Sequence, residues 1–288
     1  MIISIASGKG GTGKTTISTN LAFSLVQSGR NVQLLDCDVE EPNAHIFLDL
    51  ENKIKENVFL PVPQIDEEKC TLCGKCAEVC VYNALFIAKD RVMFFPQLCH
   101  SCGGCSYFCP REAISEIDRV IGEIGAGDAC LTRGSTYGIE FAYGKLNIGE
   151  VMAPPLMRKL KKRIDEDKVV IIDAPPGTSC PMIEAVKGSD FCFLITEPTP
   201  FGLNDLKLAV ETLKVLKIPF AVLINRWNEE YFEVDSYCEK ENISIAMRIP
   251  LERKIAELYS RGILFSKELP EWQKAFCKLF DFIEALRK

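Results

Sequence analysis

The chain has 288 residues, with 34 basic and 40 acidic side chains, a net charge of −6 and 14 cysteines. This acidic balance argues against sequence-independent nucleic-acid binding, which depends on clustered Lys and Arg. No apolar run approaches the ~18 residues of a membrane helix, and the apolar segment Met1 to Ala6 is too short for a signal peptide. We therefore expect a cytoplasmic protein of about two domains, with no nucleic-acid partner and no membrane partner.

The first predicted element is a buried parallel strand at Ile2 to Ala6. The next residues, Gly-Lys-Gly-Gly-Thr-Gly-Lys-Thr at 8–15, match the phosphate-binding pattern G-x4-G-K-[ST], and a helical pattern follows them as far as Gly29. Strand, glycine loop and helix N-terminus together predict a site for nucleotide phosphates. Lys14 should reach the β- and γ-phosphates, and Thr15 should hold Mg²⁺. The predicted contacts from this loop are Gly8, Lys9, Gly10, Gly11, Thr12, Gly13, Lys14, Thr15 and Thr16.

A second predicted strand, Val32 to Leu35, ends in Asp36-Cys37-Asp38. Taken alone, each aspartate is explained by a cap or turn at the end of a strand. However, ligands of open α/β sheets gather at the carboxyl ends of the strands. We therefore expect Asp36 and Asp38 to lie near the glycine loop.

Eight cysteines then form an internal repeat with an offset of 29 residues. Each copy reads C-x2-C-x2-C-x3-C, and the two copies are Cys70, Cys73, Cys76, Cys80 and Cys99, Cys102, Cys105, Cys109. Disulfide pairing would not require the two copies to have the same spacing. Zinc ribbons use paired C-x2-C knuckles, which also differ from this pattern. Three cysteines at i, i+3 and i+6 plus a fourth are typical of an iron–sulfur cubane loop, with a zinc-stabilised mini-domain as the alternative.

Over about Pro61 to Ser115 this segment resembles a bacterial-type ferredoxin with two [4Fe–4S] clusters. In such repeats the fourth cysteine ligates the other cluster. The resemblance thus implies one cluster on Cys70, Cys73, Cys76 and Cys109, and a second on Cys99, Cys102, Cys105 and Cys80. The family's proline follows Cys109 as Pro110, but Val81 replaces it after Cys80, which places the local turn in question.

A later predicted strand, Val169 to Ile172, ends in Asp173-Ala174-Pro175-Pro176-Gly177. The chain resembles the deviant Walker A ATPases of the MinD/ParA family. The resemblance rests on this strand end, on Asp38 and on Lys9 as the second residue of the glycine loop. The resemblance implies an ATP-sandwich homodimer in which Lys9 contacts the partner's phosphates. It implies that Asp38 positions the attacking water and that Gly177 senses the γ-phosphate. Asp36 and Asp173 are expected in the Mg²⁺ site or its outer shell, and the catalytic set is Lys9, Lys14 and Asp38.

Two further strand ends fit adenine recognition in this family. Phe220 to Ile224 is followed by Asn225 and Arg226, and Ile245 to Ile249 is followed by Pro250. The resemblance implies that these three residues contact the base of ATP or ADP. The alternative for Asn225 is an ordinary turn residue after a strand.

Alternating helical and strand patterns predict a doubly wound, mostly parallel α/β sheet of the P-loop NTPase type, with a small α+β ferredoxin domain inserted. The expected organisation is residues 1–58 as the first part of the ATPase, 59–115 as the ferredoxin and 116–288 as the second part. The first part should supply two strands and two helices to a parallel sheet. An irregular hairpin region is expected between about Arg119 and Gly149, and two helices should close the chain.

These features predict an ATP-binding and ATP-hydrolysing dimeric switch that carries two [4Fe–4S] clusters and couples its nucleotide state to electron transfer with a partner protein, as in the nitrogenase iron protein. One alternative is an iron–sulfur carrier or maturation ATPase resembling Mrp, whose partner accepts a cluster. Another is a positioning ATPase resembling MinD, in which the ferredoxin is a docking module.

Overall fold

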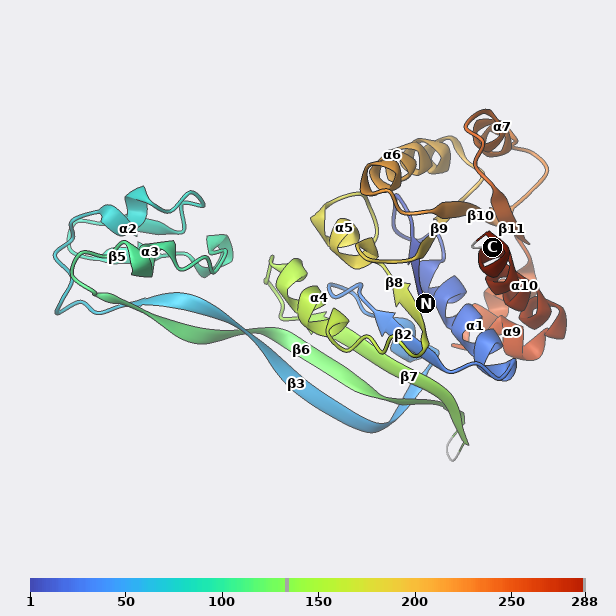
Figure 1. The fold of residues 1–288 in the computed structure, drawn as a ribbon, viewed down its shortest axis with the longest axis horizontal. Helices are drawn as coiled ribbons and strands as arrows, with labels where there is room; N and C mark the ends of the chain where they lie inside the picture. The colour runs from blue at the N-terminus through green and yellow to red at the C-terminus, as the bar shows by residue number, and fades with distance from the viewer. Residues whose placement is uncertain (133–134, 287–288) are drawn as a thin grey trace.

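The computed structural model describes residues 1–132 and 135–286, and these form a nine-stranded sheet covered by helices and a small separate lobe (Figure 1). The strands of the large sheet are β1 (Ile2–Ala6), β2 (Val32–Asp36), β3 (Asp49–Ile65), β6 (Ile114–Thr132), β7 (Ser135–Leu146), β8 (Val169–Asp173), β9 (Phe191–Thr196), β10 (Phe220–Trp227) and β11 (Ile245–Pro250). Their order is β11-β10-β9-β1-β8-β2-β7-β6-β3. From β11 to β7 all neighbours are parallel, whereas β6 and β3 are antiparallel additions. The prediction of a mostly parallel, doubly wound sheet is confirmed.

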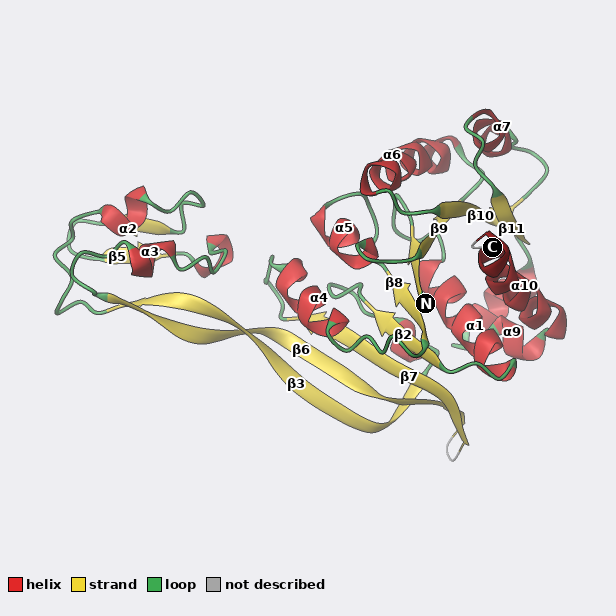
Figure 2. Ribbon diagram, viewed as in Figure 1, coloured by secondary structure: helices red, strands yellow, loops and turns green. Residues whose placement is uncertain are grey.

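Helices cover both faces of this sheet, as Figure 2 shows. One face carries α1 (Lys14–Gln27), α8 (Arg253–Ser260), α9 (Phe265–Glu268) and α10 (Pro270–Leu286). The other carries α4 (Ala153–Lys161), α5 (Cys180–Val186), α6 (Pro200–Leu216) and α7 (Glu233–Lys240). Alternate side chains of a strand point to opposite faces, so Ile5 of β1 packs into the first core and Ala6 into the second. Among the described helices, none is long and apolar enough to cross a membrane.

Two details of the predicted element order are wrong. In place of a second helix before residue 58, the chain makes only a 3-10 turn at Ala44–Ile46 and then enters β3. The reason is local, because the Asp36 carboxylate accepts the backbone N–H groups of Asn43 and Ala44 and ties this segment to the end of β2. The chain also closes with three helices rather than two, since Pro270 begins α10 as a separate helix from α9.

The irregular hairpin expected between about Arg119 and Gly149 is formed by β6 and β7, whose register shifts between Ala129 and Thr132, and β7 also joins the sheet beside β2. The glycines of this hairpin allow close packing and do not interrupt its strands. A Cβ at Gly144 would lie 2.2 Å from Leu156 Cδ2, and one at Gly122 would lie 2.6 Å from Leu156 Cδ1. Helix α4 can therefore pack directly on the backbone of the hairpin.

Strands β3 and β6 continue past the sheet as a two-stranded ribbon that we call the arm, residues 59–65 and 114–121 (Figure 1). Pairing between β6 and β7 stops at Gly122 and Leu146, whereas β3 and β6 pair on to Ile65 and Ile114. At about 3.3 Å per residue, the arm reaches roughly 23 Å beyond β7. Because β3 runs in the same direction as β7, the arm leaves the sheet at its carboxyl edge. The predicted domain limits at 58/59 and 115/116 fall within these two strands.

The arm carries the cysteine lobe, residues 66–113. It contains α2 (Lys75–Glu78), the antiparallel pair β4 (Leu85–Ile87) and β5 (Val92–Phe94), a 3-10 turn (Pro96–Leu98) and α3 (Gly104–Tyr107). The repeat of 29 residues in the sequence is also a repeat in the backbone. Left-handed φ values occur at Leu72 and Ser101, at Gly74 and Gly103, and at Asn83 and Glu112. The two halves of the lobe are thus copies of one cysteine loop, turn and short helix.

Candidate functional site

The glycine loop has the backbone that a phosphate-binding loop requires. Gly13 has φ +96°, and a Cβ there would lie 2.4 Å from Asn225 Nδ2. Only glycine fits this position without strain. Asn225 Nδ2 donates a hydrogen bond to the Thr12 carbonyl at 2.8 Å, so the end of β10 supports the loop from behind. Helix α1 begins directly after the loop, at Lys14.

A cavity of about 360 Å³ opens at this helix N-terminus, at the carboxyl edge of the sheet. Its volume is in the range of small-ligand pockets. The structure brings ten of the predicted nucleotide-site residues together around it: Gly10, Gly11, Gly13, Lys14, Thr15, Thr16, Asp38, Asn225, Arg226 and Pro250. Residues outside the predicted contact set also line it, among them Glu41, Asn43, Leu251, Glu252, Ile255, Ala256 and Tyr259. The side chains of Ile255, Ala256 and Tyr259 on α8 give the cavity wall an apolar surface against which a flat ring can pack.

Three carboxylates and one ammonium group meet beside the cavity. Burial lowers the pKa of Lys14, while the nearby Asp173, Asp38 and Asp36 oppose that shift. Burial raises the pKa of Asp38 to about 6 and that of Asp173 to about 7, and in both cases Lys14 acts in the opposite direction. Both carboxylate oxygens of Asp173 are buried, with the hydroxyls of Thr15 and Ser18 near them. A buried carboxylate beside a hydroxyl is a fitting acceptor for a divalent cation or for the water around one.

The remaining predicted residues lie behind or beside the cavity. The oxygens of Asp36 accept the backbone N–H groups of Asp38, Asn43 and Ala44, so Asp36 organises the segment that carries Asp38. Gly8 packs against the backbone of Asp205 in α6, Thr12 is buried, and the Gly177 N–H bonds to the Ser7 carbonyl at 3.0 Å. Lys9 points to Glu197 instead, at 2.9 Å.

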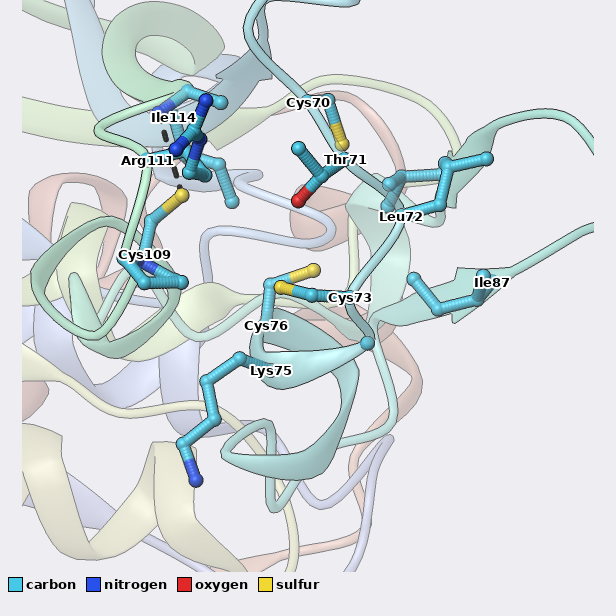
Figure 3. A pocket seen from close by; sticks show the side chains of 14 residues that line it. Cys70, Thr71, Leu72, Cys73, Lys75, Cys76, Ile87, Cys109, Arg111 and Ile114 are labelled. Carbon is cyan, nitrogen blue, oxygen red and sulfur yellow. Dashed lines mark hydrogen bonds between the residues drawn. The ribbon is translucent and has the colours of Figure 1, made fainter.

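In the cysteine lobe, two hollows each collect four cysteines from both repeats. The first is lined by Cys70, Cys73, Cys76 and Cys109, and Figure 3 shows their sulfur atoms around it. The second is lined by Cys99, Cys102, Cys105 and Cys80. In both hollows three cysteines come from one repeat and the fourth from the other, and these are the two sets that the ferredoxin resemblance implies.

Backbone N–H groups already point at several of these sulfurs. The N–H of Ala84 lies 3.3 Å from Cys80 Sγ, and the N–H of Ala113 lies 3.3 Å from Cys109 Sγ, at equivalent positions of the repeat. A third, from Ser101, reaches Cys99 Sγ at 3.4 Å. The left-handed residues described above turn these N–H groups inward. Four of the seven non-glycine residues with positive φ in the described chain lie in this lobe, and such conformations concentrate at ligand clamps.

The thiols surround each hollow rather than converging on one point. Among the described residues, no three His, Cys, Asp or Glu side chains lie close enough together to ligate a single metal ion. Burial raises the pKa of the Cys105 thiol to about 11 and also raises that of Cys76. These thiols are therefore protonated unless a metal replaces the proton.

Comparison with known proteins places the chain in one family. Residues 3–265 match the CobQ/CobB/MinD/ParA nucleotide binding domain. An uncharacterised protein of Methanocaldococcus jannaschii is 33% identical over 98% of this chain and 98% of its own. The iron-sulfur cluster carrier protein of Pyrococcus abyssi is 21% identical over 91% of this chain and 77% of its own. The solved septum site-determining protein MinD of Pyrococcus horikoshii, complexed with Mg-ADP, superposes with a TM-score of 0.58 at 20% identity, covering 99% of this chain and 96% of its own.

The family match spans most of the chain, and the glycine loop lies within the matched residues. The chain belongs to the CobQ/CobB/MinD/ParA family of P-loop nucleotide-binding ATPases.

Proposed function

We propose that this ATPase is a nucleotide-dependent switch that carries two [4Fe–4S] clusters in a ferredoxin-like lobe and couples ATP binding and hydrolysis to electron transfer with a partner protein. The observation that carries the proposal is the pairing of two four-cysteine hollows with a P-loop cavity in one chain. Residues 59–115 form the proposed redox unit, and residues 1–58 and 116–288 form the ATPase.

At the nucleotide site, the loop N–H groups and Lys14 bind the phosphates of ATP, and Thr15 and Asp173 are placed to hold Mg²⁺ or its water. When bound, Mg²⁺ neutralises charge on the phosphates. Asp38, with a pKa of about 6, is mostly ionised at neutral pH. It can therefore accept a hydrogen bond from the attacking water and orient it. Asn225, Arg226, Pro250 and the α8 wall enclose the adenine.

The cysteine hollows fit a cubane cluster in donor set and surroundings. Each offers four thiols, at least one backbone N–H group directed at a sulfur, and a small apolar core that includes Ala84 or Leu85. When bound, each cluster supplies a one-electron carrier. The chain's own contribution is to hold the four thiolates, to donate hydrogen bonds to their sulfurs and to limit the access of water.

Coupling between the two sites follows from the arm. It leaves the sheet at the edge that carries the nucleotide cavity, and its strand β3 is joined to β2 through residues 37–48, which include Asp38. A change at Asp38 on γ-phosphate loss is thus transmitted along β3 toward the lobe. In the proposed ATP-sandwich homodimer, the two arms project from the paired edges, so closure of the dimer changes how the lobes meet their partner.

The test is anaerobic purification with iron and sulfide analysis, followed by oxidation kinetics of the dithionite-reduced protein. We expect about eight iron and eight sulfide per chain, and an oxidation rate that differs between the ATP-bound and ADP-bound protein. Zinc in place of iron would refute the cluster assignment. Equal rates with both nucleotides would refute the coupling.

A second candidate function is an iron–sulfur carrier, and the similarity to the Pyrococcus abyssi carrier protein favours it. Transfer of iron and sulfide from the holoprotein to an apo-ferredoxin separates the two. A carrier loses its clusters to the acceptor when ATP is added, whereas an electron-transfer switch retains them.

A further inference from the structure

Lys9 forms an ion pair with Glu197, a carboxylate that has no role in the nucleotide binding and hydrolysis described above. Its Nζ lies 2.9 Å from Glu197 Oε2, and the other oxygen of Glu197 lies 2.6 Å from Arg226 NH1. The Glu197 side chain is only 11% exposed, whereas those of Lys9 and Arg226 are 31% and 55% exposed. The carboxylate is thus the fixed, buried centre of the group, and the two cations reach it from outside.

The fold explains why these three residues meet. Lys9 follows β1, Glu197 follows β9 and Arg226 lies at the end of β10, and these strands are neighbours in the sheet. Arg226 has a left-handed φ of +53°, where the register between β10 and β11 shifts. Three adjacent strand ends therefore build the cluster at the carboxyl edge, beside the nucleotide cavity.

We propose that Glu197 is a positioning residue that holds Lys9 within its own protomer in the resting state, and that the ATP-bound dimer forms only when Lys9 exchanges this carboxylate for the phosphates of the partner's ATP. The proposal rests on the proposed ATP-sandwich dimer and adds its control. A single protomer keeps Lys9 paired, so the lysine is not offered to a partner until phosphates compete for it.

Arg226 makes this exchange reversible. A buried carboxylate that loses its sole cation carries a large penalty. Glu197 keeps the Arg226 guanidinium at 2.6 Å after Lys9 leaves, so the charge stays compensated. Since two protomers exchange their lysines in one dimer, the strength of the pair enters the dimerisation constant twice.

The first test reads Lys9 directly and needs neither ATP nor clusters. An amine-acylating reagent, acetyl N-hydroxysuccinimide, is applied to the native protein and to Glu197→Gln, and acetylation of Lys9 is counted by peptide mass spectrometry. We expect Lys9 labelling to rise about three- to tenfold in Glu197→Gln. Unchanged labelling in a folded variant would overturn the proposal.

A matched control exists at the opposite edge of the sheet. Glu140 also bridges two partners, Lys168 at 2.5 Å and Gln33 at 2.9 Å. Glu140→Gln should leave the labelling of Lys9 unchanged, and it should raise that of Lys168 only slightly, because Lys168 keeps its ion pair with Asp165 at 3.0 Å. If Glu197→Gln does not fold, Glu197→Asp keeps the charge but shortens the reach by one methylene, and it should give an intermediate increase at Lys9. No increase in Glu197→Asp would likewise contradict the proposal.

The second test measures the ATP concentration at which half of the protein is dimeric, by light scattering with Asp38→Ala as the common background to prevent hydrolysis. Adding Glu197→Gln should lower this concentration about three- to tenfold, and adding Glu140→Gln should leave it unchanged. A variant whose nucleotide site is merely distorted would need more ATP to dimerise, so a lower requirement points to the loss of the Glu197–Lys9 ion pair. An equal or higher ATP requirement in Glu197→Gln would overturn the proposal that Glu197 restrains Lys9. If ATP gives no dimer in any variant, the proposed dimer is refuted. The labelling experiment still shows whether Glu197 holds Lys9 within one protomer.

Discussion

Cys109 lines the same hollow as Cys70, although the two residues belong to different cysteine repeats. The reciprocal exchange brings Cys80 into the hollow of the second repeat. Each proposed cluster thus ties the two halves of the lobe together, and neither half has a complete ligand set alone.

This crossing predicts a specific pattern of iron loss. Cys73→Ser and Cys109→Ser should each remove about half of the iron, because both cysteines belong to the first hollow. The double variant should lose no more iron than either single variant. Iron analysis of anaerobically purified protein is the measurement, with circular dichroism to check that the ATPase remains folded. If each repeat instead held its own cluster, the double variant would lose nearly all of its iron.

Gly13→Ala should weaken nucleotide binding by about tenfold or more, because the new Cβ would both strain a backbone at φ +96° and collide with Asn225. Isothermal titration with ADP and Mg²⁺ measures the affinity. Gly188→Ala is the control, since its φ is +82° but no atom lies within 4 Å of the new Cβ. It should lose stability and keep its affinity for ADP. Native affinity in Gly13→Ala would show that the loop does not bind phosphate in this conformation.

Binding and turnover should separate between Lys14 and Asp38. Lys14→Ala removes a charge-assisted phosphate contact and should reduce ATP affinity about ten- to hundredfold. Asp38→Ala should bind ATP normally but hydrolyse it at least a hundredfold more slowly, because only the orientation of water is lost. Equilibrium binding and phosphate release are compared for each variant. Hydrolysis at the native rate in Asp38→Ala would contradict the role given to Asp38.

Asp173 should make the stability of the nucleotide-free, Mg²⁺-free protein depend on pH. Its folded pKa of about 7 lies above the ordinary 3.8, so the folded state binds this proton more tightly than the unfolded state. Its contribution is therefore largest at low pH and is lost as the pH rises toward about 7. The free energy of unfolding of native protein relative to Asp173→Asn should fall between pH 5 and pH 8, measured by urea denaturation. A relative stability that rises over this range would contradict the sign.

The sequence predicts the parts of this protein that local spacing encodes. The glycine loop, the strand-end aspartates and the cysteine repeats each lie within a few residues, so their patterns indicate ligands before any fold is known. The hairpin was predicted, but its addition to the sheet beside β2 was not, because the close packing of Gly122 and Gly144 involves Leu156 of a helix that follows later in the sequence. Glu197 was missed because its two partners, Lys9 and Arg226, follow or end neighbouring strands that are distant from it in the sequence. The arm was missed because the pairing of β3 with β6 spans the whole cysteine lobe.

The central claim is that nucleotide state and cluster redox state are coupled in one molecule. The most direct measurement is the dissociation constant of ATP for the oxidised and the dithionite-reduced protein, made anaerobically in the Asp38→Ala background, with Lys9→Ala as the dimer-deficient control. Coupling free energies between sites are typically about 1–3 kcal/mol, and they are reciprocal. We therefore predict that reduction changes ATP affinity by roughly 5- to 150-fold, and that Lys9→Ala diminishes this difference. Equal ATP affinities in the two redox states would contradict the account.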